Sequence, residues 1–214
     1  MDEQSQRSAL LSAITTEHFV LQTANNSTYA EASARSTLYV MALSSALVAM
    51  GFVASSTDLL VPFAAISMPA VFLLGIFTIV RLVESALESM QCLTGIARIR
   101  GFYRTLGPEA ARHFAEKFGR WPEVKPPALR FGPALAFFGT TAAMVAVINN
   151  VVAGVGIALL ARFLGPSAPH WVGVVAGIAG ALTLTWLFYL YQRWRFDDYD
   201  ARARQCAEDP GGSL

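Results

Sequence analysis

The chain has 214 residues, 16 basic against 15 acidic side chains, and a formal net charge of +1 at neutral pH. Hydrophobic residues make up 54% of it and charged residues only 14%, which fits a membrane protein better than a soluble domain. The segments outside its long apolar runs are too short to build a sizeable core of their own.

The N-terminal segment, residues 1–35, is expected to contain an amphipathic helix. Apolar residues recur three and four apart over residues 9–22, and Asn25-Asn26-Ser27 predicts a break before the chain enters the membrane. The apolar face would pack on the protein's own cytoplasmic helices. Alternatively it would lie on the bilayer surface, although basic flanks are missing. The acidic start, Met1-Asp2-Glu3, lacks the basic region of a cleavable signal peptide.

Four uncharged runs follow, and each is long enough to span a bilayer as a helix, which takes about 20 residues. They predict an all-α fold, a four-helix transmembrane bundle with cytoplasmic helical extensions. One transmembrane hairpin would occupy residues 36–81 and the other residues 131–193. The expected spans cover residues 37–55, 59–80, 131–161 and 170–192.

The central segment, residues 82–130, is expected to be helical and cytoplasmic. An apolar stripe predicts that the second helix continues beyond the membrane with this face buried, until Gly101 ends or bends it. Pro108 and Glu109 predict the start of a short helix, with Phe114 and Phe118 on one face and Gly119 as its C-terminal cap. The stripe consists of Val83, Ala86, Met90, Leu93 and Ala97.

The basic residues predict the orientation. All but Arg162 of the 16 lysines and arginines lie before the first span, between the second and third, or after the fourth. Because basic loops stay cytoplasmic, both termini and the central segment are expected inside a plasma or inner membrane. The tail, residues 194–214, would be polar and disordered past Asp209.

Two adjacent amides, Asn149 and Asn150, fall near the middle of the third span. A carboxamide in hydrocarbon is costly unless it is hydrogen-bonded, so the pair indicates either a helix–helix contact or a polar ring lining a pore. Candidate partners are Ser44 and Ser45 in the first span, and Thr183 and Thr185 in the fourth.

Small residues predict that the third and fourth spans pack closely, since helices approach where side chains are absent. The candidates for this contact are Gly154, Gly156, Gly173, Gly177 and Gly180. Pro62 and Pro69 suggest kinks in the second span.

A third candidate site is cytoplasmic, where Arg98, Arg100 and Arg104 alternate with Phe102 and Tyr103. This patch would touch anionic lipid head groups or, alternatively, hold a nucleotide. Asp197, Asp198 and Asp200 are expected to be solvated and partly paired with arginines, because the glycine of a calcium loop is missing. The scattered histidines and cysteines predict no metal site, and no cofactor motif or nucleic-acid partner is indicated.

Residues 23–32 (TANNSTYAEA), running into residues 44–49 (SSALVA), resemble the helix that enters the first span in small bacterial membrane effectors of the Pycsar and SLATT type. The resemblance covers residues 20–100 at most. It implies a paired span, a cytoplasmic helical part and membrane disruption after a signal is sensed. The chain departs from that pattern by its second pair of spans and by lacking a recognisable sensor domain.

These patterns predict a non-enzymatic, oligomeric membrane protein that acts by packing, by binding a partner or by forming a permeation path. One alternative is a membrane-disrupting or channel-forming effector. Another is the membrane subunit of a transporter or enzyme complex. No ionisable residue lies well inside a span, which argues against a proton-coupled transporter or pump.

Overall fold

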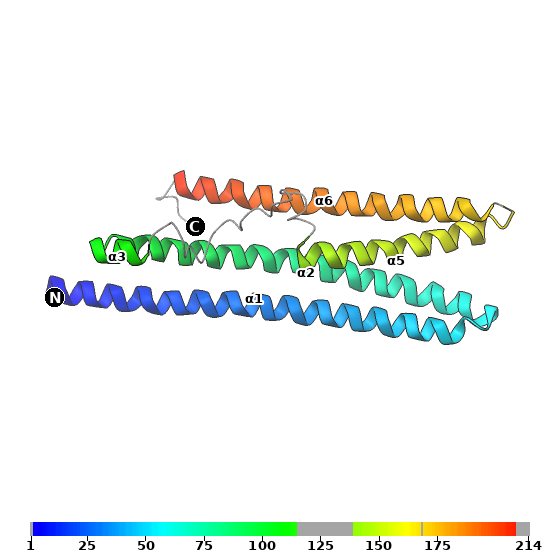
Figure 1. The fold of residues 1–214 in the computed structure, drawn as a ribbon, viewed down its shortest axis with the longest axis horizontal. Helices are drawn as coiled ribbons and strands as arrows, with labels where there is room; N and C mark the ends of the chain where they lie inside the picture. The colour runs from blue at the N-terminus through cyan, green and yellow to red at the C-terminus, as the bar shows by residue number, and fades with distance from the viewer. Residues whose placement is uncertain (1, 115–138, 168, 209–214) are drawn as a thin grey trace. The chain divides into compact units, whose positions relative to one another are not determined.

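Helices account for nearly all of the chain that the computed structural model describes, which is residues 2–114, 139–167 and 169–208 (Figure 1). They are α1 (Glu3–Val53), α2 (Thr57–Arg104), α3 (Pro108–His113), α5 (Thr141–Leu164) and α6 (His170–Glu208). No strand occurs in those three ranges, and the all-α prediction is confirmed for them. The chain divides into two compact units, Met1–Ser33 with Glu84–Pro133 and Ala34–Val83 with Ala134–Leu214.

Four of the helices, α1, α2, α5 and α6, are long and apolar enough to cross a membrane. Large apolar side chains on all four are exposed, which water would penalise and hydrocarbon would not. Examples are Phe52, Ile66, Phe77, Phe163, Leu182 and Trp186. The helices therefore match a multi-pass membrane protein in length, composition and surface.

Helix α1 is continuous over 51 residues, and the predicted break at Asn25-Asn26-Ser27 is wrong. At about 1.5 Å per residue the helix is roughly 77 Å long, far more than the ~30 Å of a hydrocarbon core. Asn25 is buried, and its Oδ1 accepts a hydrogen bond from Ser89 Oγ at 2.7 Å. This tertiary contact outweighs the weak preference of asparagine for turns.

Helix α2 runs through Gly101 to Arg104, so of the two alternatives at that glycine, an end or a bend, the end is wrong. Its buried face in the first unit differs from the predicted stripe, because Ala86 is exposed while Ser85 and Ser89 are buried. Leu21 of α1 lies against Gly95, where an added Cβ would be 2.8 Å from Leu21 Cδ1. Small side chains on α2 thus allow α1 to approach closely, which hydropathy alone did not predict.

Helix α3 begins at Pro108 with Glu109 in its first turn, as predicted, and ends at His113. The predicted face partner Phe118 and the predicted cap Gly119 lie outside the described residues. Phe114 directly follows α3, with its ring centroid 5.3 Å from that of Tyr103 on α2.

Helix α5 begins at Thr141, ten residues after the predicted start of the third span. The Thr140 side chain accepts a hydrogen bond from the Ala143 backbone N–H at 3.2 Å, which caps the helix. Residues 131–138, which the prediction placed inside the span, lie outside the described residues.

Helix α6 continues well beyond the predicted span end, as far as Glu208. The first part of the predicted tail is therefore helical, because alternating charges stabilise it through pairs one turn apart. The predicted disorder past Asp209 concerns residues that the structure does not describe. Figure 1 shows α5 and α6 running side by side and joined by a short connection.

Candidate functional site

The two amides of α5 are both buried and both hydrogen-bonded within the chain. Asn149 is fully buried in the second unit. Its Oδ1 accepts a hydrogen bond from Tyr39 OH of α1 at 3.2 Å, and its Nδ2 donates to the Phe72 carbonyl of α2 at 3.3 Å. A single carboxamide therefore contacts two other helices, with its oxygen and its nitrogen each paired.

The neighbouring amide, Asn150, is hydrogen-bonded to α6. Asn150 Nδ2 donates to Thr185 Oγ1 of α6 at 3.1 Å, and the Thr185 hydroxyl donates in turn to the Ala181 carbonyl at 2.8 Å. Successive residues on a helix point about 100° apart, so Asn149 and Asn150 contact different neighbours. Together they link α5 to α1, α2 and α6.

The partners expected in the first span are not the ones found. Ser44 and Ser45 lie exposed on α1, and Thr183 donates to its own helix at the Ala179 carbonyl. The partner found is Tyr39, a fully buried tyrosine of the first apolar run that sequence patterns did not single out. A buried tyrosine needs a hydrogen-bond partner, and this requirement is the signal that could have paired it with an amide.

Gly75 of α2 completes this arrangement. A Cβ added to Gly75 would lie 2.8 Å from Asn149 Nδ2 and closer still to Oδ1 and Cγ, so any larger residue would collide with the carboxamide. We call Tyr39, the Phe72 carbonyl, Gly75 and Asn149 the carboxamide junction. No glycine of the second span had been singled out from the sequence.

The glycines of α5 and α6 form a second close contact. A Cβ added to Gly154 would lie 2.7 Å from the Gly177 carbonyl oxygen. A Cβ added to Gly173 would lie 3.1 Å from the Ala158 carbonyl oxygen. At Gly180 the Cβ would instead meet the end of the Ile157 side chain. Gly156 has nothing within 4 Å of an added Cβ, so it lies away from this contact.

The arginine patch has a packing role in the first unit. The Arg100 guanidinium lies 5.8 Å from the centroid of the Phe114 ring, which also contacts Tyr103. This cation–π contact holds the end of α3 against α2. Arg98 and Arg104 are exposed near the end of α2.

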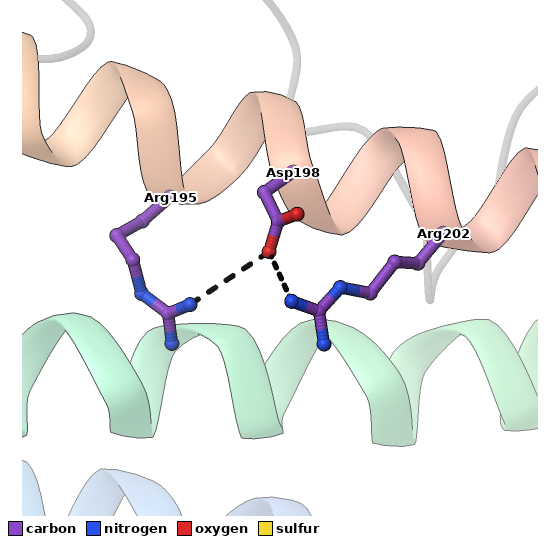
Figure 2. A network of polar contacts seen from close by, with 3 residues as sticks. All are labelled: Arg195, Asp198 and Arg202. Atoms are coloured by element: carbon purple, nitrogen blue, oxygen red, sulfur yellow. Dashed lines mark ion pairs between the residues drawn. The ribbon is translucent and has the colours of Figure 1, made fainter.

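Two of the three aspartates of α6, Asp197 and Asp198, are paired with arginines, which fits the expected partial pairing. Asp198 Oδ2 lies 2.7 Å from Arg202 and 3.9 Å from Arg195, so it sits between two guanidinium groups (Figure 2). Arg193 lies 3.6 Å from Asp197. Such pairs, spaced three and four residues apart, support an extended helix by a few tenths of a kcal/mol each, about 0.2–0.5.

Metal chemistry is not indicated by the described residues, which contain no group of three or more histidine, cysteine, aspartate or glutamate side chains placed to hold an ion. Comparison with protein-family models, curated proteins and solved structures found no match to this chain.

Proposed function

We propose that the chain is an integral membrane protein that crosses the bilayer four times and acts through helix packing, with copies of itself or with a membrane partner, rather than through catalysis. The observation that carries this proposal is the distribution of side chains on the four apolar helices. Large apolar residues face outward, while the amides Asn149 and Asn150 face other helices of the same chain.

The distribution of charge supports an orientation with both termini and the central segment in the cytoplasm. Only Arg162, among the 16 basic residues, lies near the connections expected on the outer side, in the last turn of α5. Arg162 contacts His170 at the start of α6, so its guanidinium remains close to the protein at the end of the helix pair.

The hydrogen bonds of the amides favour packing over a permeation path. An amide that lines a pore presents a donor or acceptor to water or to an ion. Asn149 instead uses its oxygen on Tyr39 and its nitrogen on the Phe72 carbonyl. We infer that these amides stabilise the helix bundle, as interhelical hydrogen bonds do in membranes.

Carbonate extraction, a membrane-potential assay and copurification test this proposal. Membranes from cells expressing the chain are washed with alkaline carbonate, and membrane potential is followed with a dye during induced expression. We expect the protein to remain in the washed membranes, and we expect no depolarisation from the wild type, from Asn149→Leu/Asn150→Leu or from the control Gly156→Ala.

Release by carbonate would contradict the membrane location. Depolarisation by the wild type that is lost in the double variant but kept in Gly156→Ala would contradict the packing role, and would favour a channel-forming effector. Copies of the chain, or a membrane partner, should copurify in mild detergent. A strictly monomeric, partner-free protein would contradict the proposed mode of action.

A further inference from the structure

The strongest unassigned feature is the match between a missing side chain on one helix and a buried polar side chain on another. Gly75 and Asn149 lie in different apolar helices, and the Asn149 carboxamide fills the space that a side chain at Gly75 would need. We propose that the carboxamide junction fixes the register in which α5 packs against α1 and α2, and that Gly75 is the position that makes this register specific.

A side chain at position 75 would be blocked sterically. Asn149 is fully buried, and both ends of its carboxamide are hydrogen-bonded. The group therefore cannot rotate away from a new methyl at Gly75 without breaking contacts to Tyr39 and to the Phe72 carbonyl. A clash with a flexible side-chain end is usually cheap, but this side-chain end is held on both sides.

Displacing the junction would also cost free energy in hydrocarbon. An amide or a tyrosine hydroxyl without a partner is costly there, because no water replaces the lost hydrogen bond. Any seating of α5 that moves Asn149 out of register leaves both Asn149 and Tyr39 unpaired. Apolar contacts along the same helices would tolerate a small slide, since leucine and valine side chains are interchangeable with lipid. The junction thus favours one register of α5 against α1 and α2, whereas apolar packing alone would not distinguish neighbouring registers.

Asn150 lies beside Asn149 on α5. Asn150 contacts Thr185 of α6, so the register chosen at the junction also places the α5–α6 pair. This inference relies on the proposed membrane location, because the cost of an unpaired amide is highest in hydrocarbon.

Thermal unfolding of the whole chain in mild detergent tests the proposal by suppression between two variants. Gly75→Ala and Asn149→Ala should each lower the Tm by roughly 2–8 °C, the range for about 1–2 kcal/mol in a chain of this size. In Gly75→Ala/Asn149→Ala the new methyl enters the vacated space. The double variant should therefore be no less stable than the worse single variant.

Gly156→Ala is the matched control, because nothing lies within 4 Å of its added Cβ. By itself it should leave the Tm unchanged. Combined with Asn149→Ala, it should neither increase nor reduce the loss in Tm that Asn149→Ala causes. Additive losses in Gly75→Ala/Asn149→Ala would overturn the proposal, as would rescue by Gly156→Ala.

Tyr39→Phe keeps the test decisive if either alanine variant fails to fold. It removes one hydroxyl with little change in shape, and should lower the Tm by about 2–5 °C because Asn149 Oδ1 loses its donor. An unchanged Tm would contradict the junction. Carbonate washing of the same membranes is scored separately, so a failure of the membrane location is distinguished from a failure of the junction.

Discussion

Two helix contacts in this protein reach close approach by different means. In the second unit, α5 and α6 meet backbone to backbone, with Gly154 directly against the Gly177 carbonyl. In the first unit, α1 and α2 meet through side chains, with Leu21 against Gly95 and a hydrogen bond from Ser89 to Asn25.

The proposed membrane location accounts for this difference through the surroundings of each contact. Between apolar helices in lipid, burying leucine gains little because lipid is equally apolar, so small residues and close backbones supply the attraction. Outside the long apolar runs, an amphipathic stripe gains free energy by leaving water, and one buried polar pair can specify the register. The buried positions of α2 there include Leu87 and Ile96, which fit this second mode.

The largest effect is expected where backbone meets backbone. In Gly177→Ala the added methyl would meet the Gly154 carbonyl oxygen and Ala158 Cβ, and neither can rotate away. The two helices must separate, which should cost about 1–3 kcal/mol by thermal unfolding in detergent. Gly180→Ala, which meets only the end of Ile157, should cost less. An equal loss in both variants would show that backbone approach is not what matters.

An intermediate effect is expected at the polar pair of the first unit. Asn25→Ala leaves the Ser89 hydroxyl without its acceptor and should cost about 1–2 kcal/mol in unfolding measurements. Replacing both partners removes the polar atoms together, so Asn25→Leu/Ser89→Ala should recover most of that loss. A double variant that is less stable than Asn25→Ala would show that the contact depends on shape rather than on hydrogen bonding.

The smallest effect concerns reactivity rather than stability. Burial raises the pKa of the Cys92 thiol above its ordinary value; a backbone hydrogen bond partly offsets this increase, and Glu88 adds to it. Because the thiolate is the reactive form, alkylation of Cys92 in a Cys206→Ser background should have its midpoint at a higher pH than that of a free cysteine. Asn25→Ala, which loosens the α1–α2 contact, should move the midpoint down. A wild-type midpoint equal to that of free cysteine would contradict the burial.

The elements that sequence patterns predicted well share a local cause. Four uncharged runs were identified because each is long and apolar enough to cross a bilayer, and four such apolar helices are found. Pro108 predicted the start of α3 because proline suits the first helical turn. Gly173 and Gly177 predicted close packing because their spacing places them on one helix face.

The elements that were missed depend on distant neighbours. Asn25 predicted a break in the first helix, but its hydrogen bond to Ser89 keeps it inside α1. Ala86 was predicted to be buried on α2, whereas Ser85 and Ser89 are the buried residues there. Ser44 and Ser45 were reasonable partners for an amide by composition, but they lie on the exposed side of α1.

The sequence by itself determined the all-helical class of the described residues, the number of apolar helices and the asymmetry of basic residues, because these follow from local hydropathy and charge. Only the tertiary structure decided which polar groups meet. Tyr39, Gly75 and Asn149 are far apart in the chain, and each alone is an ordinary residue of an apolar helix. They form one junction because three helices pack in a register that pairs every polar atom of the Asn149 carboxamide.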